Sequence, residues 1–135
     1  MTASQTINRN AIVDRFVAMW NEHDPVARRQ AIEEVYAPDA EYLMFANDPI
    51  VGHDAIATQV DYAHNLYYDQ GYSFRSSHNA DGHHNLVRFT WVLVNTETGE
   101  LERNGSELFV LAPDGRIQHD YQFLIKPAIA TWADY

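Results

Sequence analysis

The stretch from 72 to 126, YSFRSSHNADGHHNLVRFTWVLVNTETGELERNGSELFVLAPDGRIQHDYQFLIK, decides the fold, because apolar and polar residues alternate along most of it. Alternation with a period of two is typical of strands, and we expect strands at 72–80, 84–96, 101–111 and 116–125. Short turns would join them at Asp81-Gly82, at Thr98-Gly99 and in the loop 112–115. The second half of the chain is therefore predicted to form an antiparallel sheet.

The first half of the chain shows helical spacing instead. One face of the first segment carries the apolar residues Ile12, Phe16, Met19 and Trp20. We predict helices at 7–23, 25–36 and 53–68, the second of them started by the pair Asp24-Pro25. A first strand is expected at 40–46 and a very short one at 50–51. This order of elements predicts one α+β domain that spans residues 1–135.

Composition limits the classes of function. The chain has 135 residues, no cysteine, and 9 basic against 19 acidic residues, for a formal charge of −10. Such a surface repels phosphate backbones and anionic membranes, so we expect neither nucleic acid nor membrane as a partner. No apolar run approaches the about 20 residues of a membrane span, and the start MTASQTINRNAIVDRF lacks the apolar core of a signal peptide, which favours a cytoplasmic protein.

Metals and cofactors are not expected. The absence of cysteine excludes zinc–thiolate sites and thiol catalysis. The neighbours His83 and His84 would point to opposite faces of a strand, and the spacing supplies no third ligand for them.

Polar side chains converge on one face of the predicted sheet. The turn at Thr98-Gly99 and the loop 112–115 set a strand register in which directly opposed residues share a face. That face would carry Arg88, Thr90, Glu107, Asp120 and Gln122. Two close carboxylates push their pKa values apart, which separates an acid from a base. We therefore predict that Arg88, Glu107 and Asp120 form a general acid–base trio; a structural ion-pair network or a solvated sheet edge is the alternative.

The same register predicts an apolar face on the other side of the sheet. It would carry Phe89, Trp91, Leu93, Leu108, Val110 and Tyr121. If Phe89, Trp91 and Tyr121 point outward, they form a patch too large to leave in contact with water. We therefore expect a homodimer through the outer sheet face.

Three short motifs carry a family resemblance: YAPDAEY at 36–42, PIVGHDAI at 49–56 and GRIQHDYQF at 115–123. In this order and spacing, the chain resembles the SnoaL-like (nuclear transport factor 2-like) superfamily. The resemblance implies a cone-shaped, strongly curved mixed or antiparallel sheet that wraps on three N-terminal helices around one pocket. It also implies that function depends on the side chains that line this pocket.

Enzymes of the superfamily provide a comparison residue by residue. Alignment with ketosteroid isomerase puts Met44 at the catalytic base, Phe16 at the catalytic tyrosine and Glu107 at the acid that donates to the oxyanion. Two of the three roles are therefore missing, which argues against a steroid isomerase of that mechanism. In polyketide cyclases the last strand commonly carries an aspartate at the position of Gln122; here Asp120 lies two residues earlier on the same face.

Further residues are candidates on the same resemblance. Related dehydratases often carry a pocket histidine at the position of His78, and the epoxide-hydrolase relatives activate water with two aspartates and an arginine, an arrangement similar to the trio above. Tyr36 matches a pocket tyrosine of the isomerase. We predict a ligand-binding set of Phe16, Trp20, Tyr36, Met44, Val60, Thr90, Phe109 and Gln122. The alternative for its aromatic members is that they are simply core.

The sequence thus predicts a protein with a pocket for a small apolar ligand. The first hypothesis is a cofactor-free acid–base enzyme of the isomerase, dehydratase, cyclase or hydrolase type, with Arg88, Glu107, Asp120 and His78 as catalytic residues. The rival is a non-catalytic ligand-binding or dimerisation module of the same fold, which the missing isomerase residues favour.

Overall fold

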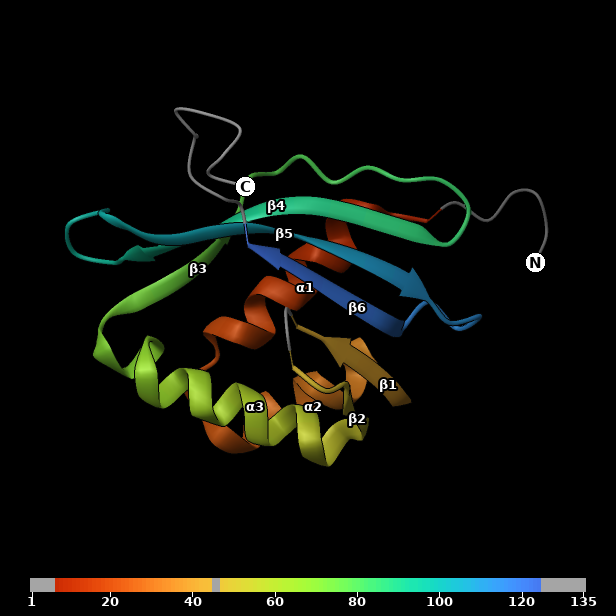
Figure 1. Cartoon of the computed structure of the whole chain (residues 1–135), viewed down its shortest axis with the longest axis horizontal. Coiled ribbons are helices and arrows are strands. Elements are labelled where there is room, and N and C mark those ends of the chain that lie inside the picture. Colours follow the sequence, from red (N-terminus) through yellow and green to blue (C-terminus); the bar gives the residue numbers. More distant parts are fainter. Residues whose placement is uncertain (1–6, 45–46, 125–135) are drawn as a thin grey trace.

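The computed structural model describes residues 7–44 and 47–124 and shows an α+β fold, a curved six-stranded sheet with helices against its inner face (Figure 1). The helices are α1 (Arg9–Asn21), α2 (Pro25–Val35), α3 (Gly52–Leu66) and the short 3-10 helix η1 (Tyr68–Gln70). The strands are β1 (Tyr36–Leu43), β2 (Ile50–Val51), β3 (Tyr72–Ser76), β4 (Leu86–Asn95), β5 (Leu101–Leu111) and β6 (Ile117–Leu124). The predicted fold class is confirmed.

The helices begin where side chains can satisfy their free backbone N–H groups. Asn8 accepts a hydrogen bond from the Ala11 amide at 3.0 Å at the start of α1. Asp24 does the same for Ala27 at 3.1 Å, and Pro25 takes the first helical position of α2, as predicted. None of the helices in the described residues is long and apolar enough to cross a membrane.

The sheet is mixed, and its strand order is β2-β1-β6-β5-β4-β3. All neighbouring strands are antiparallel except β1 and β6, which run parallel. β1 begins at Tyr36, directly after α2, and not at residue 40 as predicted. The early start matters because it brings Tyr36 beside Ile117 of β6.

The register of β4 against β5 differs by one residue from the prediction. Thr90 lies opposite Ser106, and Phe89 lies opposite Glu107. The turn comprises residues 96–99, since Asn95 and Glu100 still bond across it, which moves the register by two residues, and a bulge at Leu93/Val94 moves it back by one. A shift of one residue exchanges the two faces of a strand, so every β4 residue points the other way from the predicted direction.

The register of β5 against β6 differs by two residues, which leaves the faces unchanged. Glu107 lies opposite Gln122, and Phe109 lies opposite Asp120. The loop closes between Ala112 and Arg116, and a bulge next to it supplies the remaining shift. The prediction that Glu107, Asp120 and Gln122 share one face is therefore confirmed, although Glu107 and Asp120 are diagonal neighbours rather than direct partners.

These registers correct the predicted apolar patch. Phe89 and Trp91 point into the protein and are 2% and 4% exposed, so they cannot form an outer patch. Tyr121 does point outward, and so does Phe123, which is 54% exposed.

Aromatic side chains fill the space between the helices and the inner face of the sheet. Phe16 of α1 occupies the centre of this core. Its ring contacts Trp20, Tyr36, Phe74, Phe89 and Phe109, with centroid distances of 4.8 to 6.4 Å. Most of these pairs meet edge to face, the arrangement that aromatic quadrupoles favour.

Candidate functional site

Two carboxyl groups lie on the inner face of the sheet, against the aromatic core. Glu107 comes from β5 and Asp120 from β6, and their exposed fractions are 1% and 0%. In the described residues neither of them forms an ion pair with an arginine or a histidine. Carboxyl groups are almost never fully buried without such a partner, which makes this pair the most unusual feature of the interior.

Tyr36 supplies a hydrogen bond to the acid pair. Its hydroxyl donates to Oδ2 of Asp120 at 2.6 Å, inside the protein. The parallel pairing of β1 with β6 places the two side chains together. The backbone of Tyr36 is fixed on both sides: its N–H closes α2 on Ile32, and its carbonyl lies 2.8 Å from Nε2 of His53. The hydroxyl is therefore held in place rather than free to rotate away.

Burial decides the protonation of the pair. Burial raises the pKa of Glu107 well above its ordinary value, and the nearby charge of Asp120 raises it further. Burial also raises the pKa of Asp120, but hydrogen bonds from Glu107 and Tyr36 oppose this rise. The proton shared by the two groups is therefore best placed on Glu107, with Asp120 ionised.

The missing hydrogen-bond partners fit this assignment. As two carboxylates, the groups only accept, and neither oxygen of Glu107 nor Oδ1 of Asp120 then has a donor in the described structure. A proton on Glu107 turns the carboxyl–carboxylate contact into a hydrogen bond to Asp120. The site then contains an acid and a base side by side, the two groups that proton transfer requires.

Three further polar groups surround the pair. Gln122 donates to the hydroxyl of Tyr42 at 2.9 Å. The indole Nε1 of Trp91 is buried without a hydrogen-bond partner in the described structure, and the proximity of Trp91 and Gln122 to Glu107 opposes the rise of the Glu107 pKa. Burial is the largest cause that raises the pKa of Tyr42, so this phenol stays neutral.

Arg88 does not belong to the site, and this prediction is wrong. The one-residue difference in register turns its side chain to the outer face, where it is 71% exposed and pairs with Asp81 at 2.7 Å. Thr90 lies on the same outer face, and its hydroxyl accepts a hydrogen bond from Asn79. The acid–base trio is thus reduced to two acids.

His78 is also placed outside the site. β3 ends at Ser76, and His78 follows in the connection to β4, exposed and with a left-handed backbone φ of 56°. The predicted strand 72–80 would have carried it along the sheet. Met44 lies near the end of β1, half-buried, with its sulfur 3.9 Å from the Gln59 amide.

The other residues of the predicted ligand-binding set lie inside the protein. Phe16, Trp20, Tyr36, Val60 and Phe109 are buried in the core, and Gln122 is half-buried. An open groove of about 1340 Å³ lies elsewhere, over the start of α1, the end of α2 and the β5–β6 loop, and neither Glu107 nor Asp120 lines it. The carboxyl pair itself has almost no exposed surface, so its role in binding stays a prediction.

Tyr42 and Trp91 were not predicted as residues of the site. Tyr42 lies six residues after Tyr36 on β1 and is equally buried, a parity that the motif YAPDAEY contains. Trp91 was assigned to the wrong face by the same register difference that misplaced Arg88.

The curved sheet, the helices against it and the buried acidic pair on its inner face define the class of this domain. Residues 13–119 match the SnoaL-like domain, and the chain belongs to this family. The comparison with curated proteins gives no match.

Solved structures agree with this assignment. A candidate isomerase of the SnoaL-like family from Agrobacterium tumefaciens is 28% identical, with 87% of this chain and 97% of that chain covered and a TM-score of 0.79. A SnoaL-like protein of unknown function from Burkholderia thailandensis is 15% identical, with 90% and 100% covered and a TM-score of 0.70. A candidate SnoaL-like polyketide cyclase from Jannaschia is 13% identical, with 91% of each chain covered and a TM-score of 0.68.

Proposed function

We propose that this protein is a cofactor-free enzyme that moves a proton within a small, mostly apolar molecule, with Asp120 as the base and Glu107 as the acid. The observation that carries the proposal is the fully buried carboxyl pair, in which Tyr36 donates to one member at 2.6 Å. The candidate isomerase among the similar structures supports the same class of chemistry.

Under this proposal each group has one task. Asp120, ionised and oriented by Tyr36, accepts a proton from a carbon atom or from a water molecule. Glu107, protonated, donates a proton to the oxygen that gains charge in the substrate. Low local polarity strengthens both transfers, because water does not compete for the charges. The surrounding aromatic residues Phe16, Trp20 and Phe109 suit a flat apolar ligand.

A non-catalytic ligand-binding or dimerisation module is the second candidate. The observation in its favour is that Glu107 and Asp120 have exposed fractions of only 1% and 0%, so a substrate reaches them only after the surrounding side chains move.

Two isosteric variants, Glu107→Gln and Asp120→Asn, separate these candidates. If the protein is an enzyme, we expect both variants to fold and to lose proton transfer. At least one of them should be more stable than the wild type, because catalytic groups are often held at the expense of stability. Deuterium incorporation from D2O into a panel of small apolar ketones measures the transfer, and urea unfolding near neutral pH measures the stability.

A matched control is Glu41→Gln. It neutralises a half-buried carboxylate of β1 that lies 3.1 Å from His119 of β6, away from the inner pair. It should leave exchange unchanged. If the wild type exchanges nothing and neither isosteric variant is stabilised, the pair is structural and the module reading replaces the enzyme. A gain of stability without exchange would place the function in ligand binding.

We also propose a homodimer through the outer face of the sheet, on the predicted residues of β5 and β6 but without those of β4, which point inward. Tyr121 and Phe123 of β6 are 37% and 54% exposed on this face, beside the half-buried Leu108 and Val110 of β5. Sedimentation analysis of the wild type and of Phe123→Glu tests it. A dimer that the substitution converts to monomer is the expected result, and a monomeric wild type would contradict the proposal.

A further inference from the structure

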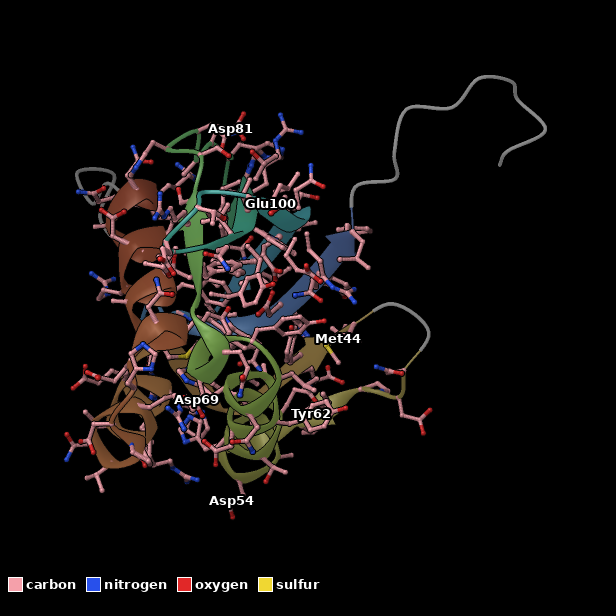
Figure 2. The ribbon with its side chains drawn as sticks, turned by 90° about the vertical axis from the view of Figure 1, so that its left-hand side faces the viewer. Met44, Asp54, Tyr62, Asp69, Asp81 and Glu100 are labelled. Carbon is pink, nitrogen blue, oxygen red and sulfur yellow. The ribbon has the colours of Figure 1, made fainter. Side chains whose placement is uncertain are left out.

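A second polar cluster lies in the helical layer, apart from the carboxyl pair. His23 is in the link between α1 and α2, His64 is in the last turn of α3, and Asp69 is in η1. Figure 2 labels Asp69 beside the lower helices. Each of the three residues offers one nitrogen or oxygen atom, and these atoms all lie within 4.8 Å of one another.

His64 is oriented as a metal-binding histidine is. Its Nε2 lies 2.6 Å from the carbonyl oxygen of Trp20, and its ring stacks on Tyr68 with a centroid distance of 4.6 Å. Because a carbonyl oxygen only accepts, Nε2 carries the proton, and Nδ1 of the neutral ring holds a free lone pair. A hydrogen bond from one ring nitrogen to a backbone carbonyl is the usual support of a histidine that binds metal through the other.

The free nitrogen of His64 is buried and points at the cluster. Its residue is 1% exposed, and Nδ1 has no hydrogen-bond partner in the described structure. The nearest acidic group is Oδ1 of Asp69, at 3.9 Å, which is too far for a hydrogen bond. A buried acceptor without a donor is unfavourable unless something binds to it.

We propose that His23, His64 and Asp69 bind a divalent metal ion of the zinc class, with water as the fourth ligand. Two nitrogen ligands and one oxygen ligand suit zinc and its transition-metal neighbours, and they exclude the hard cations magnesium and calcium, which prefer oxygen alone. This site differs from the His83–His84 pair that the sequence drew attention to, and it departs from the expectation of no metal.

Small movements complete the coordination. The nitrogen of His23 lies 3.7 Å from Oδ1 of Asp69. Tetrahedral zinc with bonds of about 2 Å brings its ligand atoms to about 3.3 Å from one another. The side chains of His23 and Asp69 are 64% and 48% exposed, so they are free to close this gap around the fixed His64.

The nearby cation Arg28 does not exclude a metal. Its guanidinium donates to Asp61 at 2.7 Å and to the carbonyl of Glu22 at 2.8 Å, so its charge is already compensated by a carboxylate. The same contact to Glu22 fixes the link that carries His23. The formal charge of −10 for the whole chain favours the approach of a cation.

A bound ion would connect the α1–α2 link to the end of α3 and to η1. His23 and His64 are more than forty residues apart in sequence, so one ion would cross-link a long stretch of the chain. We assign the ion a structural task in the helical layer, since the cluster contains neither Glu107 nor Asp120.

Isothermal titration of the metal-free full-length chain with zinc chloride tests the proposal. The two exposed ligands allow variants that keep the core intact: His23→Ala and Asp69→Asn. We expect each variant to weaken zinc binding at least about tenfold. Zinc at about one hundred times its dissociation constant should raise the Tm of the wild type by several degrees and leave the double variant unchanged.

His83→Ala is the matched control, because it removes an exposed histidine whose Nδ1 lies 2.9 Å from that of His84. It should bind zinc as the wild type does. The proposal is overturned if both His23→Ala and Asp69→Asn bind zinc as tightly as the wild type, if the loss occurs in His83→Ala instead, or if the wild type binds no better than the double variant.

Discussion

Two acidic sites lie on opposite faces of the same sheet, and their surroundings differ completely. On the inner face, Glu107 and Asp120 are fully buried, and Asp120 accepts a hydrogen bond from the neutral hydroxyl of Tyr36. On the outer face, Asp81 is 58% exposed and forms a bidentate pair with the guanidinium of Arg88 at 2.7 and 3.1 Å.

The two sites differ in the free energy that the folded protein spends to hold them. An exposed ion pair contributes little stability, but it also requires little, because water solvates both partners. Buried carboxyl groups lose their hydration, and well-packed apolar residues in their place are often at least as stable. The inner pair therefore needs a reason other than stability, whereas the outer pair does not.

The largest effect we expect comes from truncating the inner base. Asp120→Ala removes the acceptor of the buried Tyr36 hydroxyl and leaves a cavity, and the two losses together should lower the free energy of unfolding by about 3 kcal/mol. Urea unfolding near neutral pH measures this. Arg88→Ala, on the outer face, is the control and should leave the midpoint almost unchanged; equal losses in the two variants would end the comparison.

A smaller effect is expected from the hydrogen bond alone. Tyr36→Phe keeps the ring but removes the donor to Asp120, which should lower the free energy of unfolding by about 2 kcal/mol, since hydrogen bonds to charged groups are the stronger ones. In an Asp120→Asn background the same substitution should lose about 1 kcal/mol less, because the acceptor is then neutral. Additive losses in this double-mutant cycle would show that Asp120 is already protonated in the native state.

The contrast between the faces also shows how far the sequence could predict this molecule. The strands, the helices and the turn residues follow from local patterns, and Asp24-Pro25 at the start of α2 was predicted as observed. The placement of Glu107 beside Asp120 was predicted too, because an error of two residues in the β5–β6 register leaves parity unchanged.

The placement of Arg88 could not be predicted in the same way. The longer turn at 96–99 alone would move the β4–β5 register by two residues and keep the faces, but the bulge at Leu93/Val94 moves it back by one, and no local pattern in the sequence indicates a bulge. The cluster of His23, His64 and Asp69 was not predicted for a different reason. It depends on how α1, α3 and η1 pack, and spacing along the chain does not show this.

The two faces should respond to pH in opposite directions. The pKa of Glu107 is raised by burial, so its contribution to stability is fully present below its ordinary value of 4.5 and is lost as the pH rises through the folded value. The pKa of Asp81 is lowered, chiefly by its hydrogen bond to Arg88, so its contribution is present above 3.8 and is lost as the pH falls.

Urea unfolding across this pH range measures both slopes. Relative to Glu107→Gln, the wild type should become less stable from about pH 4.5 towards neutrality. Relative to Asp81→Asn, the wild type should become less stable only towards acid pH. If both variants differ from the wild type with the same sign of slope, the protonation assigned to the inner pair is wrong.

The smallest effect is expected for Asp81→Asn itself near neutral pH. The bridge between Asp81 and Arg88 is made by their backbones, N–H to carbonyl in both directions at 3.0 and 2.9 Å, and asparagine keeps these bonds. Only the exposed side-chain pair is lost, so any change in the unfolding midpoint should be seen at low salt and vanish in about 0.5 M NaCl, where the screening length is only a few ångströms. Asp120→Asn supplies the comparison, because its effect arises in the interior and should persist at that salt concentration. A salt-insensitive loss in Asp81→Asn would show that the outer pair holds the connection between β3 and β4 in place, and that the two faces differ less than their burial indicates.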